Sequence, residues 1–316
     1  MKEYGGYIEL DTYGGDLLHG DAVQLNCGRR CLTYLIRARK IRKIMLPRFI
    51  CDSVTSACID EGVQIRWYGV DFRFHPLCAQ PGEDEWLYLV NYYGQISNEE
   101  IVKIASEYPR LIVDNAQAYF RMPVPGVDTL YTCRKYFGVA DGAFLYTDAV
   151  YPEKLPRGES YDRIGFLVGR FERSASEFYD LYRQNNAMFS SEPVRKMSRL
   201  TENMLRALDY KRIKKAREDN FAYLYRKLAS VNELALTVPD GAFMYPLMVR
   251  NGREIRKRLQ AEKIYVPLLW PDVFARCRPE DPDYRMAADI LPLPVDQRYG
   301  IGDMEAITGA VMDCIQ

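Results

Sequence analysis

Short apolar runs alternate with helical periodicities through the first half of the chain. A helix is predicted from Gly28, because Leu32, Leu35 and Ile36 follow at the spacing of one buried helix face. A second helix is predicted over residues 99–107. The apolar runs, which are typical of strands buried on both faces, are residues 44–46, 63–68, 86–90, 111–113, 128–131 and 143–146. This alternation predicts an α/β fold with a mostly parallel central sheet.

The second half of the chain has a different pattern. Residues 192–228 predict one long, charge-rich helix with an apolar face. The elements expected after it are a strand at 243–249, a helix at 253–262, a strand at 290–294 and a terminal helix from Asp303. We therefore expect two domains. The first is a large α/β domain with an N-terminal arm over residues 1–190. The second is a linking helix and a smaller α+β C-terminal domain over residues 191–316.

Charge and composition exclude several classes of partner and site. The 316 residues include 43 basic and 43 acidic side chains, so net charge gives no reason to expect nucleic acid or a membrane surface as a partner. The sequence starts without an apolar signal segment and has no apolar run long enough to span a membrane, which predicts a cytoplasmic protein. Only 2 histidines are present, and the 8 cysteines form no Cys-x-x-Cys pair. We expect reduced thiols and no metal site.

Three segments carry side chains suited to chemistry. Gly28 and Arg29 open a predicted helix, whose free N–H groups form a ready anion site; a plain helix cap is the alternative. Asp114 ends a buried strand, where open α/β sheets bind ligands; a turn residue or helix cap is the alternative. Lys135 lies between two predicted strands, and a solvated loop charge is the alternative. Each segment taken alone is a weak signal.

Taken together, the three segments follow the order found in fold-type I pyridoxal-phosphate enzymes. The chemistry of that cofactor needs these parts. Its phosphate needs N–H donors, its pyridine nitrogen needs a carboxylate in order to stay protonated, and its aldehyde needs an amine for the Schiff base. An anion site, an acid and a lysine in this order therefore indicate a pyridoxal 5'-phosphate site.

Most of the chain resembles the DegT/StrS family of sugar aminotransferases. Seven segments carry the resemblance in the family's order: residues 6–10, 26–29, 46–71, 91–95, 113–118, 132–135 and 291–299. The resemblance implies a mostly parallel sheet of the fold-type I kind. It makes Lys135 the Schiff-base lysine and Asp114 the partner of the ring nitrogen. Gln117 falls where the family contacts the ring hydroxyl or its surroundings. The phosphate is expected at Gly28, assisted by Arg29 and Thr132.

Three features depart from the family pattern. Cys51 lies where many members place a flat side chain against the cofactor ring, and the loop from Thr132 to Lys135 is two residues shorter than the usual form. The Asn-aromatic-Arg segment that in many members reaches the phosphate of the neighbouring subunit has no counterpart near residues 185–198, where Asn185 or Asn186 is the candidate substitute. These departures leave the nucleotide-sugar substrate open.

The resemblance implies an aminotransferase that takes an amino group from an amino-acid donor, by resemblance glutamate, and gives it to a keto sugar. A nucleotide-linked sugar in polysaccharide or related biosynthesis is the expected acceptor. Two alternatives stay open: another reaction on the same cofactor, such as sugar dehydration, and a binding or regulatory protein that has lost turnover. We also expect a homodimer, because the stretch from Tyr4 to Tyr13 has no place in the β/α core and the chain holds 24 tyrosines, a residue type enriched at interfaces.

Overall fold

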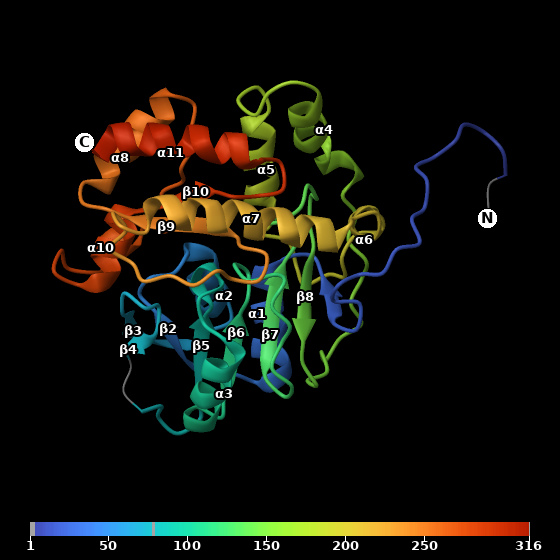
Figure 1. The fold of residues 1–316 in the computed structure, drawn as a ribbon. Coiled ribbons are helices and arrows are strands. Elements are labelled where there is room, and N and C mark those ends of the chain that lie inside the picture. Colours follow the sequence, from blue (N-terminus) through green and yellow to red (C-terminus); the bar gives the residue numbers. More distant parts are fainter. Residues whose placement is uncertain (1–3, 78–79, 316) are drawn as a thin grey trace.

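The computed structural model describes residues 4–77 and 80–315, and Figure 1 shows its two sheets. The larger sheet has eight strands in the order β1-β8-β7-β6-β5-β2-β3-β4. Its strands are β1 (Val23–Leu25), β2 (Lys43–Pro47), β3 (Gln64–Val70), β4 (Pro76–Leu77), β5 (Glu85–Val90), β6 (Leu111–Asp114), β7 (Asp128–Thr132) and β8 (Ala143–Tyr146). All six predicted strands of the first half are present in this sheet.

Most of this sheet is parallel. Strands β3, β2, β5, β6 and β7 pair in parallel, whereas β8 pairs antiparallel with both β7 and β1, and β4 pairs antiparallel with β3. Every residue of β6 is buried, as are residues 44–47 of β2. Such strands read as continuous apolar runs because helices or loops cover both of their faces.

Helices connect the parallel strands. They are α1 (Gly28–Arg39), α2 (Asp52–Asp60) and α3 (Asn98–Glu107). Helix α1 packs on α2, β7 and β8 through buried residues that include Cys31, Leu32 and Leu35. Helix α3 starts with a capping box, in which the Ser97 side chain accepts from the Glu100 N–H and the Glu100 carboxylate accepts from the Ser97 N–H. Local sequence therefore fixes where α3 begins.

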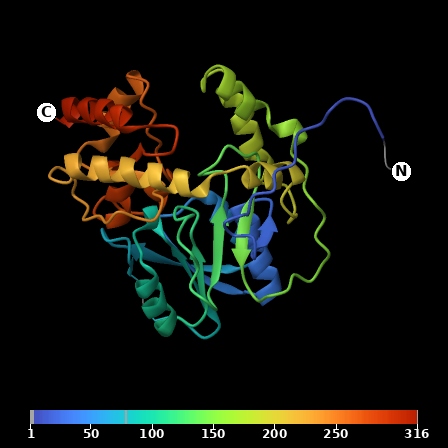
Figure 2. The same ribbon diagram turned by 45° about the vertical axis from the view of Figure 1, so that its right-hand side comes forward.

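The C-terminal part holds a second, two-stranded antiparallel sheet of β9 (Met244–Met248) and β10 (Ile290–Pro294), in which Leu247 pairs with Leu291. Its helices are α7 (Tyr210–Leu228), α8 (Gly252–Ala261), α9 (Val273–Arg276), α10 (Pro282–Asp289) and α11 (Ile301–Ile315). Figures 1 and 2 show α7 between the large sheet and the helices α8 and α11. The C-terminal ends of the parallel strands face α7, which places this helix above the expected site.

The prediction of one helix over residues 192–228 is wrong. Two helices are present, α6 (Arg199–Arg206) and α7, and residues 192–198 are not helical. The break follows from two side-chain caps: the Ser198 hydroxyl accepts from the N–H of Thr201, and the Asp209 carboxylate accepts from the N–H of Arg212. Helices α4 (Gly165–Glu172) and α5 (Tyr179–Met188) were not predicted.

Two exposed segments lie outside the sheets. Residues 4–16 form no helix or strand and lead away from the body of the protein in Figures 1 and 2. This arm is held at its base, where the Asn203 carboxamide bonds the backbone of Tyr13 and Asp11. The pair α4–α5 projects on the same side and exposes apolar side chains such as Phe171. Among the described helices, none combines the length and the apolar character that crossing a membrane requires.

Candidate active site

The predicted site residues all lie at one edge of the large sheet. Strands β1, β2, β6 and β7 run in the same direction, so their C-terminal ends meet at this edge. Each candidate is the end of one of these strands or follows it closely; they are Gly28 and Arg29 after β1, Cys51 after β2, Asp114 and Gln117 at and after β6, and Thr132 and Lys135 at and after β7. The topology therefore brings the seven candidates to one side of the fold.

The first turn of α1 faces the end of β7. Cys27 is the N-cap and makes no side-chain capping bond, so N–H groups of the first turn have no partner from a cap side chain. A Cβ on Gly28 would lie 3.7 Å from Cβ of Thr132, in the space between the helix start and the strand end. The helical backbone at Gly28 needs no glycine for its conformation, and a Cβ would make ordinary van der Waals contacts with Thr132 and Leu130. These N–H groups and the Thr132 hydroxyl form a cradle that fits an anion.

Arginine side chains surround this cradle without matching carboxylates. Arg29 and Arg134 each bury an Nε that has no acceptor. Both lie near Cys27. Burial raises the pKa of the Cys27 thiol, and the charges of these two arginines lower it. Arg134 stacks on Phe189, 4.7 Å from the ring centroid, and donates to Asn186. No carboxylate within the described residues lies at ion-pair distance from Arg29 or Arg134. Burial lowers the pKa of Arg134, which an anionic ligand would offset.

A second arginine packs on the same ring but has its own carboxylate. Arg163 lies 5.3 Å from the centroid of Phe189 and forms an ion pair of 2.8 Å with Glu192. Glu192 also accepts a hydrogen bond from Asn26, the residue before the N-cap of α1. The neighbouring guanidinium of Arg163 further lowers the pKa of Arg134. Positive charge therefore exceeds negative charge at this end of α1.

Asp114 presents a buried carboxylate at the end of β6. Its Oδ2 accepts from the Tyr88 hydroxyl at 2.8 Å, and its Oδ1 accepts from the N–H of Ala116 at 2.8 Å. Burial is the main cause that raises the pKa of Tyr88, and the nearby charge of Asp114 is the second. The Tyr88 hydroxyl therefore stays protonated and donates to Asp114. A carboxylate has about four acceptor sites, and these two bonds leave others for a ligand such as a protonated ring nitrogen.

Gln117 holds a strained turn beside the site. Its Oε1 accepts from the N–H of Tyr93 at 2.8 Å, and its side chain is buried. Tyr93 has φ 52°, a left-handed backbone that non-glycine residues rarely adopt. Such conformations persist where the surroundings over-determine them, and they cluster at functional sites. The Oε1 atom of Gln117 is thus engaged within the protein, and its amide nitrogen is the donor left for a ligand.

Cys51 occupies the N-cap of α2 and is half-buried. Its Sγ lies 2.9 Å from Oγ of Ser53. The Cys51 side chain also contributes to the raised pKa of Tyr88, the same hydroxyl that bonds Asp114. Cys51 and Asp114 therefore both lie near Tyr88. The seven described cysteines form no disulfide, and Cys78 lies outside the described residues.

Lys135 is exposed on the turn that follows β7. The turn is closed by two backbone bonds of 2.9 Å, from the N–H groups of Tyr136 and Phe137 to the carbonyl of Cys133. The Lys135 ammonium lies 5.6 Å from the centroid of Phe243, and it forms no ion pair with any residue in 4–77 or 80–315. An accessible amine without a carboxylate partner can react with an aldehyde.

Several residues that contact the candidates were not identified from the sequence. Tyr88 contacts Asp114 from a strand position that carries no local motif. Tyr93 contacts Gln117 from the segment 91–95, which is part of the family resemblance but was given no role in the site. Arg134 had a signal, because it directly precedes Lys135. Asn186 accepts from Arg134, and Asn185 donates to the carbonyl of Ala140 while its own Oδ1 is buried without a donor. Both asparagines therefore lie close to the lysine turn of their own chain.

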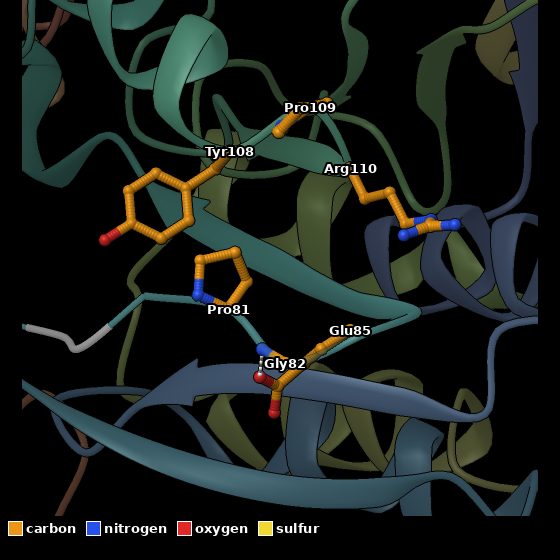
Figure 3. A pocket seen from close by; sticks show the side chains of 6 residues that line it. All are labelled: Pro81, Gly82, Glu85, Tyr108, Pro109 and Arg110. Atoms are coloured by element: carbon orange, nitrogen blue, oxygen red, sulfur yellow. Dashed lines mark hydrogen bonds between the residues drawn. The ribbon is translucent and has the colours of Figure 1, made fainter.

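A pocket of about 340 Å³ lies at the opposite edge of the sheet (Figure 3). It is lined by Pro81, Gly82, Glu85, Tyr108, Pro109 and Arg110. Glu85 points back to its own loop, where it accepts from the N–H of Gly82 at 2.9 Å. Because β5 and β6 start here, this pocket is separated from the candidate site by the length of the sheet.

The sequence matches no family model and no curated protein. The structure is similar to the sugar aminotransferase CalS13 from Micromonospora echinospora, with a TM-score of 0.64 and 16% identity over 93% of this chain and 88% of that one. It is also similar to DesV from S. venezuelae, solved in complex with a ketimine intermediate, with a TM-score of 0.66 and 18% identity over 93% and 85%.

A DegT DnrJ EryC1 StrS aminotransferase from Brucella abortus is similar at a TM-score of 0.63 and 15% identity, over 93% of this chain and 86% of that one. At identities of this size the similarity establishes the fold. The chain has the fold of these three proteins, a mostly parallel sheet of the fold-type I kind with a smaller C-terminal α+β part, and the predicted fold class is confirmed.

Proposed function

We propose that the protein is a pyridoxal-phosphate-dependent aminotransferase that moves an amino group from an amino-acid donor to a keto sugar. One observation carries the proposal: an anion cradle, a buried carboxylate and an accessible lysine lie at one edge of a sheet whose fold is that of sugar aminotransferases. The resemblance of the sequence to the DegT/StrS family supports the same activity. Glutamate as donor and a nucleotide-linked acceptor are the finer parts of the proposal, as is a cytoplasmic location.

The residues present fit the cofactor. Its phosphate suits the first turn of α1, where Gly28 leaves room and Arg29, Thr132 and Arg134 supply donors or positive charge. Asp114 can keep a ring nitrogen protonated, and Gln117 and Cys51 adjoin the same region. When bound, pyridoxal phosphate supplies an aldehyde and an electron-withdrawing ring. Lys135 would supply the amine that holds this aldehyde, and its Nζ could take up and release a proton beside a bound substrate.

Borohydride reduction tests the assignment of Lys135. The cofactor-loaded protein should be yellow, and reduction should fix the cofactor to the peptide that contains residue 135. The Lys135→Arg variant, which keeps the charge but removes the primary amine, should give no such peptide. Addition of glutamate to the unreduced protein should convert the cofactor to its amino form, and its absorbance should shift accordingly. Label on Lys103 or Lys154, or no response to any amino donor, would contradict the proposal.

The functional unit that we propose is a homodimer with its sites near the interface. The arm exposes Tyr7 and Ile8 at 97% and 94%, and the pair α4–α5 exposes Phe171 at 88%. Apolar exposure of this extent is typical of an interaction surface. Helix α5 also reaches the lysine turn through Asn185 and Asn186, so a partner that covers α4–α5 would lie next to the site.

Light scattering at low micromolar concentration tests the dimer. The expected mass is twice the 36.7 kDa of one chain. Replacement of Phe171 by Glu should shift the mass toward one chain, because a charge would be buried at the interface. An active wild-type protein with the mass of a single chain would contradict the proposal.

We also propose a domain boundary near residue 190, because the chain from there leads through α6 and α7 to the second sheet.

A further inference from the structure

Arg217 on α7 is the largest fully buried side chain in the described part of the protein, at 1% exposure. Within that part no carboxylate lies at ion-pair distance from it. Burial lowers the pKa of its guanidinium, so the fold bears a cost to keep a cation here. The N–H groups of Arg217 are instead bonded to neutral oxygen acceptors.

The hydrogen bonds of Arg217 converge on the turn that carries Lys135. Its Nη2 donates to the carbonyl of Tyr136 at 3.0 Å, and its Nε donates to Oε1 of Gln297 at 2.8 Å. Gln297 in turn donates from Nε2 to the same Tyr136 carbonyl at 2.9 Å. Because Arg217 can only donate and the carbonyl can only accept, the orientation of the Gln297 amide is fixed. The three groups form a closed triangle on the residue next to Lys135.

The same guanidinium also fixes the surface against which the Lys135 ammonium rests. Nη1 of Arg217 donates to the carbonyl of Ala242 at 2.8 Å and, more weakly, to that of Phe243 at 3.4 Å. The plane of the guanidinium lies over the Tyr136 ring, 4.5 Å from its centroid. Phe243 is the ring that faces the lysine Nζ. One side chain therefore fixes both the backbone beside Lys135 and the ring beside its amine.

We propose that Arg217 is a positioning residue for Lys135, acting through Tyr136, Gln297 and Phe243. Its role in catalysis rests on the proposed function, whereas its role in ordering the turn does not. Arg217 and Gln297 come from α7 and from the loop after β10, so the C-terminal part of the chain sets the place of a lysine carried by the large sheet.

Amide hydrogen exchange on the cofactor-free protein tests the ordering of the turn. The N–H groups of Tyr136 and Phe137 report it, because both bond the carbonyl of Cys133. Arg217→Met should speed their exchange about tenfold or more, since it removes charge-assisted bonds. Gln297→Leu removes the neutral donor to the Tyr136 carbonyl and the acceptor of Arg217 Nε but leaves the direct bond from Arg217, and should speed it about threefold. The affinity for pyridoxal phosphate, measured by absorbance titration, should fall in the same order.

Arg256→Met is the matched control. Arg256 is also buried on a C-terminal helix and donates to a backbone carbonyl, that of Ile290, at 2.8 Å. Both arginine variants should unfold at lower temperature, but only Arg217→Met should loosen the lysine turn. Equal exchange in the two variants would overturn the proposal. If Arg217→Met fails to fold, unchanged exchange in Gln297→Leu would overturn it. A wild-type protein that does not link the cofactor at Lys135 would instead contradict the proposed function.

Discussion

The two edges of the large sheet differ in how completely their arginines are paired with carboxylates. At the edge where the parallel strands begin, arginines meet carboxylates: Arg39 bonds Asp128 at 2.8 Å and Arg66 bonds Glu85 at 2.9 Å. At the edge where the strands end, Arg29 and Arg134 bury guanidinium N–H groups without a carboxylate or an acceptor. The pocket of Figure 3 lies at the first edge, and the candidate active site lies at the second.

This difference in charge pairing indicates which edge is better suited to bind a ligand. Paired charges satisfy each other and contribute to folding, so a hollow between them needs no occupant. Buried donors without acceptors carry a cost that a bound anion removes. Perturbed or unpaired charged groups cluster at functional sites for this reason. The pocket of Figure 3 alone would point to the edge where the strands begin, whereas the unpaired polar groups favour the edge with Asp114 and Lys135.

The largest expected effect comes from Asp114 at the unpaired edge. Asp114→Asn keeps an acceptor for Tyr88 but cannot hold a ring nitrogen protonated, so the rate of cofactor conversion by glutamate should fall about a hundredfold or more. The unfolding temperature should fall only modestly, because asparagine keeps the size of the side chain but can accept only one of the two hydrogen bonds from Tyr88 and Ala116. Stopped-flow absorbance gives the rate and calorimetry gives the stability. A rate close to that of the wild type would show that Asp114 has another role.

The order of elements at this edge could be predicted from the sequence. Buried strands such as residues 111–113 have a distinct apolar pattern, and Asp114 and Lys135 stand directly at strand ends. Side chains that come from distant elements could not be predicted. Arg217 is 82 residues from Lys135 in the chain (217 − 135), and it is one of many basic residues in a charge-rich helical segment. The break between α6 and α7 was missed because Asp209 acts as a cap only in its folded context.

A smaller effect is expected from Arg134 at the same edge. If it neutralises the phosphate of the cofactor, Arg134→Gln should weaken pyridoxal phosphate about tenfold, because a charge-assisted bond is lost. Pyridoxal, which lacks the phosphate, should bind the variant and the wild type alike. Absorbance titration with the two compounds separates a phosphate contact from a general disturbance of the site, since a disturbed site would weaken both compounds equally.

Arg42→Gln is the control for net charge in that experiment. Arg42 is exposed just before β2, at the edge where the strands begin, and its loss changes the charge of the protein by the same amount. It should leave the affinity for both compounds unchanged. A loss of pyridoxal phosphate affinity in Arg42→Gln equal to that in Arg134→Gln would mean that long-range electrostatics, and not a local contact, accounts for the effect.

The smallest effect is expected at the paired edge, from Arg66. Hydrogen bonds from Arg66 hold the pKa of the buried Glu85 below its ordinary value of 4.5. A carboxylate with a lowered folded-state pKa stabilises the fold above its unfolded pKa, and this contribution is lost as the pH falls below 4.5. Arg66→Gln should therefore lower the free energy of unfolding by about 1 kcal/mol at pH 7, since Arg66 is partly exposed, and the difference from wild type should close in acid. Urea unfolding at pH 7 and at pH 3.5 measures the free energy of unfolding under both conditions.

The affinity of Arg66→Gln for the cofactor should equal that of the wild type. A loss of affinity comparable to that in Arg134→Gln would contradict the distinction between the two edges.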